Sequence, residues 1–348
     1  MKNKVDSTSW LRNLVIENKR NIFAGADHDL TILQVSVSRP FHRRGDRYHQ
    51  ILRIKYETQG GVYTKRIWLK YRNDLARSYQ IHRAVCKELE EEKRFFPQPY
   101  FYGESHRNGK SVVGMEFVTG ASLRNMVIRN AVYKGREVLE EIFSEVGAAL
   151  RTFHDSSKSS GLRLVGELAD NARSVTERSK YLSKEEREEV IGWIGMAERR
   201  AGAEMQLPLI KIHHDWILRN ILITDTGSPY IVDLDSMRAP DNSRWYDVTC
   251  FLINLESQLK YRPLISRGKL ANLWKSFWQG YAEELVPEGL SENQVMALIY
   301  LIKVEYLFGG TMRPPLFETY NKLLGRRYLN NLRDAVTRGE YSTLRVDL

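Results

Sequence analysis

The stretch "HHDWILRN" (residues 213–220) is followed, thirteen residues after its asparagine, by the first aspartate of "VDLDS" (232–236). Two short apolar runs, "ILIT" and "YIVD", lie between these polar groups and flank a turn that contains Gly227 and Pro229. Apolar runs around such a turn predict a β-hairpin. Because a hairpin reverses the chain, it would bring Asp233 back alongside the first stretch.

The polar side chains of these two stretches suit one kind of chemistry. Phosphoryl transfer needs a proton acceptor beside the attacking hydroxyl and a divalent cation that neutralises phosphate charge. Mg²⁺ prefers carboxylate and carbonyl oxygens as ligands. Asp215 provides the acceptor, and Asn220 and Asp233 provide metal ligands. The alternative is that these residues only cap turns around a hairpin, but three chemically matched residues at these intervals favour the catalytic interpretation.

On these residues the chain resembles the protein-kinase-like phosphotransferases, nearest to the aminoglycoside phosphotransferase and choline kinase branch, whose signature is H-x-D-x-x-x-x-N followed by I-D. The resemblance implies an α+β fold with two lobes, a small antiparallel β-sheet N-lobe and a mainly helical C-lobe. It implies ATP, with GTP left open, and Mg²⁺ as cofactors, with Asp215 catalytic and Asn220 and Asp233 on the metal. The second acid of "VDLDS", Asp235, is a third candidate metal ligand, and this I-D-x-D ending is similar to bacterial lipopolysaccharide-sugar kinases.

Two further motifs resemble the nucleotide-binding part of that family. "IWLKY" (67–71) resembles the strand with the nucleotide-binding lysine, which makes Lys70 the candidate ligand of the α- and β-phosphates. "GMEFVTGASL" (114–123) resembles the hinge between the lobes, where backbone groups of Glu116 and Val118 would meet the adenine.

The same region departs from the family pattern in two places. The nucleotide loop "RPFHRRGDR" (39–47) has a single glycine, and Arg43 and Arg44 are candidate phosphate ligands, although arginines at a hairpin tip explain them equally well. Ser78 stands where the family has the glutamate that pairs with the lysine, and Glu88, ten residues further along the same predicted helix, is left open as a substitute.

The C-terminal part carries two more similar motifs, "SRWYDVT" (243–249) and "FWQGYAEE" (277–284). Only fourteen residues separate Asp233 from Asp247, which leaves no room for the long activation segment of a protein kinase. The resemblance therefore implies a small-molecule hydroxyl, rather than a protein side chain, as the phosphoryl acceptor.

Three residues near the catalytic stretch are expected to support it. The resemblance implies that His213 orders the loop by hydrogen bonding and that Asp247 ties the loop from the start of a helix. Trp216 either lines the acceptor pocket or covers the core, and the sequence leaves both readings open.

Local patterns divide the chain into a β-rich beginning and a helical remainder. Strands are predicted over 30–72, a helix over 75–96, a hairpin over 101–118 and an amphipathic helix over 137–154. Helices resume at about residue 247.

These patterns and the resemblance together predict two domains. The N-lobe is expected to span 1–118 and the C-lobe 119–348, with the hinge at about 115–120. Within the C-lobe lie the catalytic loop 213–220 and the metal loop 233–235.

Composition excludes several classes of protein. With 348 residues, 42% of them hydrophobic and 28% charged, the chain resembles an ordinary globular protein. No run reaches the roughly 18 apolar residues of a membrane span, and the first residues have no signal-peptide pattern. The two cysteines, Cys86 and Cys250, offer neither a disulfide framework nor a metal-binding spacing. We therefore expect a cytoplasmic location.

The formal net charge of +10 is concentrated near the N-terminus, where residues 36–72 hold ten Lys or Arg and two acids. Such an excess favours a polyanionic partner, or it is simply a solvated face. Nucleic acid is disfavoured because no recognition motif accompanies the charge. The expected partners are a nucleotide and a small molecule with a hydroxyl group; the oligomeric state is left open.

The sequence thus predicts an ATP- and Mg²⁺-dependent phosphotransferase that acts on a hydroxyl of a sugar or an aminoglycoside-like metabolite. Two alternatives stay open. One is a nucleotide-binding pseudokinase with a regulatory role, which Ser78 favours. The other is a kinase of a lipid-linked saccharide of the lipopolysaccharide type, with peripheral contact to a membrane.

Overall fold

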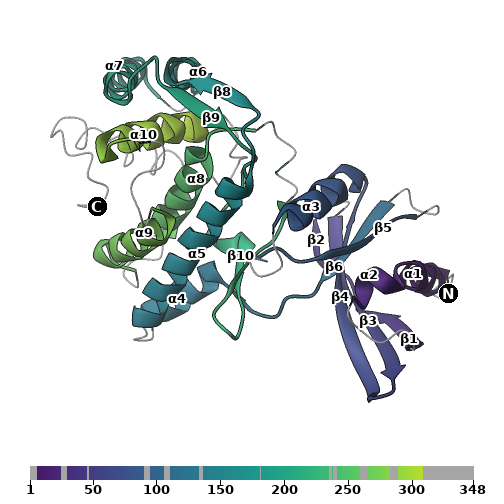
Figure 1. The fold of residues 1–348 in the computed structure, drawn as a ribbon. Coiled ribbons are helices and arrows are strands. Elements are labelled where there is room, and N and C mark those ends of the chain that lie inside the picture. The colour runs from purple at the N-terminus through teal and green to yellow at the C-terminus, as the bar shows by residue number, and fades with distance from the viewer. Residues whose placement is uncertain are drawn as a thin grey trace. The chain divides into compact units, whose positions relative to one another are not determined.

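The computed structural model describes residues 6–24, 30–44, 47–89, 95–105, 110–132, 136–180, 182–234, 237, 241–258, 265–282 and 289–308 (Figure 1). The chain divides into two compact units. Unit 1 comprises Met1–Gly120 and Tyr230–Arg238, and unit 2 comprises Ala121–Pro229 and Ala239–Leu348. The segment that contains Asp233 therefore belongs to unit 1 together with Lys70.

Unit 1 is built on an antiparallel sheet with the strand order β1-β3-β4-β6-β5, and β2 pairs with β3 at one end. The strands are β1 (Thr31–Val37), β2 (Phe41–Arg44), β3 (Arg47–Thr58), β4 (Gly61–Arg72), β5 (Pro99–Ser105) and β6 (Lys110–Glu116). Three helices accompany the sheet: α1 (Asp6–Glu17), α2 (Lys19–Ile22) and α3 (Ala76–Glu88).

Alternation along β4 gives the sheet two different faces. Ile67, Leu69 and Tyr71 are buried, and they point to the face that contains the core of unit 1. Since successive side chains of a strand point to opposite faces, Lys70 lies on the other face. This period-two pattern explains why a strand carrying one functional lysine is otherwise rich in apolar residues.

Helix α1 packs onto the core face through Leu11, Leu14 and Val15. Gly103 in β5 permits this packing, because a Cβ atom at that position would lie 2.6 Å from a methyl group of Leu14 and 3.2 Å from the Trp10 ring. The sheet and the N-terminal helices thus share one hydrophobic core.

Unit 2 is mainly helical. Its helices are α4 (Leu123–Val132), α5 (Arg136–Ser156), α6 (Val165–Glu177), α7 (Lys184–Ala201), α8 (Trp245–Glu256), α9 (Arg267–Tyr281) and α10 (Glu292–Phe308). The short strands are β7 (Ala121–Ser122), β8 (Gly161–Leu164), β9 (Gln206–Leu209) and β10 (Ile221–Ile223), with β8 antiparallel to β9 and β10 antiparallel to β7. A 3₁₀ turn (Leu218–Asn220) leads into β10, and β11 (Pro229–Ile231) follows the next turn.

Helices α5 and α9 lie side by side in unit 2 (Figure 1). Two glycines allow their backbones to approach closely. A Cβ atom at Gly147 would lie 2.1 Å from the carbonyl oxygen of Phe277, and one at Gly280 would lie 1.9 Å from that of Ser144. The glycine of "FWQGYAEE" is therefore explained by helix packing.

The predicted division into an antiparallel sheet and a mainly helical remainder is confirmed. The helix predicted over 75–96 was too long, because α3 ends at Glu88 and Leu89 is already extended. The pairing of β8 with β9 was not predicted. Both cysteines are free thiols. Among the helices that the structure describes, none combines the length and the apolar character that crossing a membrane requires.

Candidate active site

In unit 1, the predicted nucleotide lysine contacts the predicted metal loop directly. Lys70 Nζ on β4 donates a hydrogen bond to Asp233 Oδ1 at 2.6 Å. The Lys70 side chain is 14% exposed and that of Asp233 is 46% exposed. Both charges therefore remain accessible to a ligand, and the pair presents a cation and a carboxylate at one place.

The backbone of Asp233 has a conformation that is unusual for its residue type. Its φ is +69°, in the left-handed region, where a Cβ atom costs about 1–2 kcal/mol. The approach to it is fixed, because the Ile231 amide donates to the Phe95 carbonyl at 2.7 Å. Strained residues of this kind cluster at functional sites. The backbone conformation thus makes this loop a candidate functional segment independently of the motif.

The predicted adenine-binding segment lies at the end of β6. The Glu116 amide donates to the Gln98 carbonyl at 2.8 Å, and Glu116 Oε2 accepts from the Gln98 amide at 3.1 Å. These two bonds leave the Glu116 carbonyl, rather than its amide, as the backbone group to offer to a base. Val118 follows in the segment that leads to the end of unit 1.

Three predicted site residues receive little or no description. Arg43 and Arg44 lie on β2, where Arg44 is in register with Arg47, but their side chains are outside the described part of the structure. Asp235 lies outside the described residues altogether.

In unit 2, the predicted catalytic aspartate and asparagine contact one another. Asn220 Nδ2 donates to the backbone carbonyl of Asp215 at 3.0 Å and to its Oδ2 atom at 2.8 Å. Only the nitrogen of the amide can donate to a carbonyl, so this network fixes the orientation of the Asn220 side chain. Asn220 Oδ1 is then the atom available to a cation. Asp215 itself is 26% exposed, and Arg219 approaches its Oδ2 atom at 3.5 Å.

A buried carboxylate holds the loop that precedes Asp215. Asp247, at the start of α8, is fully buried and accepts the backbone amides of His213 at 2.7 Å and His214 at 2.8 Å. His214 has a φ of +63°, so the loop is held in a left-handed turn. The Asp215 amide then donates to His213 Nδ1 at 3.2 Å. These hydrogen bonds fix the backbone of the turn that leads to Asp215.

Two residues that the sequence analysis did not single out complete this network. His154, at the end of α5, lies with its Nε2 atom 3.3 Å from Asp247 Oδ2 and its Nδ1 atom 2.9 Å from the Tyr281 hydroxyl on α9. His154 is fully buried. A histidine at the end of the apolar stripe of an amphipathic helix was the available signal, because a buried imidazole needs polar partners.

Burial decides the protonation of this group. Burial lowers the pKa of His154 from its ordinary value of 6.5, although the hydrogen bond to Asp247 opposes the effect. Burial would raise the pKa of Asp247, but the His154 hydrogen bond and the neighbouring histidine groups outweigh it and lower that pKa. We assign a neutral His154 whose Nε2–H donates a hydrogen bond to an ionised Asp247. Its Nδ1 atom accepts a hydrogen bond from the Tyr281 hydroxyl.

Trp216 belongs to the core of unit 2. Its side chain is fully buried, and its ring lies 6.4 Å from that of Phe153 and 5.7 Å from that of His213. The reading of Trp216 as a core residue is the correct one.

The oxygen donors of the two loops suit a hard divalent cation. Asn220 offers Oδ1, and Asp233 offers a half-exposed carboxylate. Within the described ranges, no three His, Cys, Asp or Glu side chains gather as a metal cluster. Each loop taken alone therefore offers few oxygen ligands, as is usual for Mg²⁺, whose remaining ligands are phosphate oxygens and water.

A sheet of antiparallel strands in unit 1, a helical unit 2 and these two loops define a protein of the protein-kinase-like class. The sequence matches the model of the phosphotransferase enzyme family over residues 35–281, and the chain belongs to that family. The comparison with curated proteins gives no match.

Comparison with solved structures gives several similar chains. A candidate aminoglycoside phosphotransferase from Ralstonia eutropha JMP134 has a TM-score of 0.59 at 12% identity, covering 95% of this chain and 97% of its own. A candidate fructosamine-3-kinase from Haemophilus somnus 129PT has a TM-score of 0.48 at 12% identity, covering 92% and 97%. Amicoumacin kinase, in complex with AMP-PNP, Ca²⁺ and its antibiotic, has a TM-score of 0.47 at 13% identity, covering 97% of both chains. The first of these similarities confirms the predicted α+β kinase-like fold.

Proposed function

We propose that this chain transfers the γ-phosphoryl group of ATP to a hydroxyl group of a small polar molecule, such as a sugar or an aminoglycoside-like compound. Membership of the phosphotransferase family supports the reaction class. The observation that carries the assignment of the catalytic residue is the hydrogen-bonded turn that ends at Asp215. This turn fixes a partly exposed carboxylate whose side-chain contacts, within the part of the chain that the structure describes, are with Asn220 at 2.8 Å and Arg219 at 3.5 Å.

Each residue has one task in this proposal. Asp215 accepts the proton of the acceptor hydroxyl. The hydroxyl oxygen forms a bond to the γ-phosphorus as the bond between that phosphorus and the β-phosphate oxygen breaks, which releases ADP. Lys70 binds the α- and β-phosphates, and backbone groups of Glu116 and Val118 bind the base. Arg43 and Arg44 are proposed as further phosphate ligands.

Asn220, Asp233 and Asp235 would hold Mg²⁺. When bound, this ion neutralises charge on the phosphate oxygens. The Lys70–Asp233 contact is consistent with phosphate binding by Lys70 and with Mg²⁺ binding by Asp233. In the structure the two side chains pair with each other; with ligands bound, Lys70 would contact phosphate and Asp233 would contact the cation.

The experiment is ADP release from Mg²⁺-ATP or Mg²⁺-GTP by wild type and Asp215→Asn, against pooled sugars, amino alcohols and aminoglycosides. We expect acceptor-dependent turnover that falls by about 10²–10⁴-fold in the variant, the usual contribution of a positioned proton acceptor. Binding of a fluorescent ATP analogue should persist. Asp225→Asn, in the exposed turn after β10, is the matched control and should behave as wild type.

Turnover that is equal in wild type and Asp215→Asn would contradict the assignment of the base. A second candidate function is favoured by one observation: Ser78, on α3, is buried where kinases have the acidic partner of the lysine. That candidate is a nucleotide-binding regulator without turnover. Tight nucleotide binding with no phosphoryl transfer to any acceptor, lipid-linked saccharides included, would select it.

A further inference from the structure

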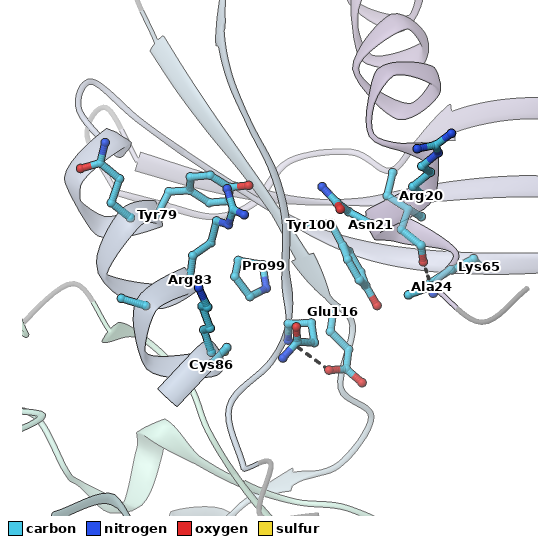
Figure 2. Close-up of a pocket in the computed structure, with 15 residues that line it drawn as sticks. Arg20, Asn21, Ala24, Lys65, Tyr79, Arg83, Cys86, Pro99, Tyr100 and Glu116 are labelled. Carbon is cyan, nitrogen blue, oxygen red and sulfur yellow. Dashed lines mark hydrogen bonds between the residues drawn. The ribbon is translucent and has the colours of Figure 1, made fainter. Parts of the chain in front are cut away.

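Unit 1 contains a pocket of about 980 Å³ whose lining includes only one residue of the proposed reaction, Glu116, and that residue contributes only a backbone group to the reaction. Figure 2 shows helix α2 on one side of it and helix α3 on the other, with strand residues between them. Pockets that bind small molecules have volumes of roughly 300–1,000 Å³. The pocket is therefore large enough for a metabolite or a nucleotide.

The pocket opens on the face of the sheet opposite to Lys70. Lys65, which lines it, precedes Lys70 by five residues on β4, and an odd separation places two side chains on opposite faces of a strand. Glu116, which also lines it, is in register with Ile67. Directly paired residues share a face, and Ile67 shares the face of Lys65. The pocket is thus separate from the Lys70–Asp233 pair.

The charged residues that line the pocket are mostly cations. Arg20 comes from α2, Lys65 from β4, and Arg83 and Lys87 from α3, whereas Glu116 is the single acid of the lining. A concave surface that gathers charge of one sign concentrates ions of the opposite sign. Four cations and one acid make this an anion-binding environment.

Lys65 is fixed in the wall of the pocket. Its Nζ atom donates to the Ile22 carbonyl and lies 5.0 Å from the centre of the Tyr100 ring and 5.5 Å from that of Phe23. Burial lowers the pKa of Lys65, although Glu116 opposes the effect. An anion in the pocket would offset the cost of burying this ammonium group.

The other three cations are placed at the surface of the pocket. Arg83 has its guanidinium carbon 5.7 Å from the centre of the Tyr79 ring, one turn earlier on α3. Arg20 and Lys87 are exposed side chains on the two flanking helices. Figure 2 shows Arg83 between Tyr79 and Cys86 on the helix side of the pocket. Arginine and lysine side chains from two elements can therefore contact more than one anionic group of the same ligand.

We propose that this pocket is a second ligand site that binds a phosphorylated small molecule. Arg20, Arg83 and Lys87 would contact its phosphate groups, and the ammonium group of Lys65 in the pocket wall would offset part of their negative charge. Phosphate is favoured because guanidinium and ammonium groups bind it through charge-assisted hydrogen bonds and because a cationic excess of this size matches a multiply charged group. The proposal does not depend on the phosphotransferase reaction.

Calorimetric titration with pyrophosphate, without Mg²⁺, tests the site. All proteins carry Lys70→Met, which removes the cation of the proposed nucleotide site. Adding Arg83→Gln and Lys87→Gln should weaken pyrophosphate binding at least tenfold. Adding Arg53→Gln and Lys55→Gln instead removes the same charge from exposed positions of β3 outside the pocket and should change the affinity less than twofold.

Hydrogen exchange supplies a second readout that does not rely on substitutions. Pyrophosphate should slow exchange in α3 over Ala76–Glu88 in the Lys70→Met protein. Loss of all binding on Lys70→Met alone would assign the anion to the nucleotide site and overturn the proposal. Equal weakening by the pocket pair and the β3 pair would also overturn it, because it would reduce the effect to overall charge.

Discussion

Asn220 uses its side-chain nitrogen to hold Asp215 at two points, the backbone carbonyl at 3.0 Å and the carboxylate at 2.8 Å. One short side chain therefore fixes both the loop and the orientation of the proposed base. The same two bonds leave Oδ1 as the outward ligand atom. In the proposed reaction, this one residue would couple the geometry of proton transfer to that of metal binding.

The first prediction concerns that contact. Asn220→Ala should lower the free energy of unfolding by about 1–3 kcal/mol, because it removes a buried side chain and leaves a partly buried carbonyl of the loop without its donor. Urea denaturation measures the change. Thr226→Ala, in the exposed turn of the hairpin, is the control and should cost less than about 0.5 kcal/mol. Equal stability of Asn220→Ala and wild type would contradict the role of this side chain in holding the loop.

The second prediction concerns Asp247. Asp247→Ala removes the acceptor of two backbone amides and of the buried His154 ring, so we expect a loss of about 3 kcal/mol or more, because each buried donor left without a partner costs about 1–3 kcal/mol. Asp247→Asn keeps one carbonyl oxygen and should lose less. Denaturant unfolding ranks the two variants. If both were within about 0.5 kcal/mol of wild type, the carboxylate would not be what holds the catalytic turn.

The sequence predicted those parts of the fold whose pattern is local. Strand alternation over 30–72 and the apolar stripe over 137–154 each specify their own element, and both are present. Helix α1 has a comparable signal in Leu11, Leu14 and Val15, which is present in the sequence but was not used. The β8–β9 pair could not be predicted in this way, because Gly161 pairs with Leu209 across more than forty residues and neither strand exceeds four residues.

The candidate site divides in the same way. Motif spacing predicted Asp215, Asn220 and Asp233 as a set, and the structure shows the contact between Asp215 and Asn220. It could not identify His154 or Tyr281, which reach Asp247 from helices distant in sequence. The sequence offered Lys70 no acidic partner at the expected position of the following helix, because Ser78 stands there. The structure shows that Asp233 is a partner of Lys70.

The third prediction separates binding from stability at the Lys70–Asp233 pair. Since Asp233 is 46% exposed, Lys70→Met should change the free energy of unfolding by less than about 1 kcal/mol. Affinity for a fluorescent ATP analogue should fall at least tenfold, which corresponds to about 1.4 kcal/mol. Lys55→Met, on the exposed part of β3, is the control and should leave affinity unchanged. Retained affinity in Lys70→Met would exclude this lysine as a phosphate ligand.

The fourth prediction uses two glycines of the same helix. Gly280→Ala would place a Cβ atom 1.9 Å from the Ser144 carbonyl oxygen, so α9 must move from α5, at a cost of about 1–3 kcal/mol or more. Gly268→Ala, also in α9, meets nothing within 4 Å and should stabilise the chain by about 0.4–1 kcal/mol. In thermal unfolding, the midpoints of the two variants should shift in opposite directions relative to wild type.

Because Tyr281 follows Gly280, Gly280→Ala should also weaken the hydrogen bond between Tyr281 and His154. A stabilising Gly280→Ala would contradict the close approach of α5 and α9.

The last prediction concerns the pH dependence of stability. The pKa of His154 is lowered by burial from its ordinary value of 6.5, so below that pH the unfolded chain binds a proton that the folded chain does not. Stability must then fall as the pH falls below 6.5, with a slope of at most about 1.4 kcal/mol per pH unit from this group.

The variant His154→Gln isolates that contribution. Glutamine can still donate to Asp247, but it does not titrate, and the seven other histidines are common to both proteins. The free energy of unfolding, measured between pH 7.5 and 5.5, should therefore decline less steeply in His154→Gln than in wild type. Parallel pH profiles would mean that His154 takes up its proton in the folded chain as readily as in the unfolded one. The ionised Asp247 would then be paired with an imidazolium, and the neutral donor assigned to the catalytic turn would be wrong.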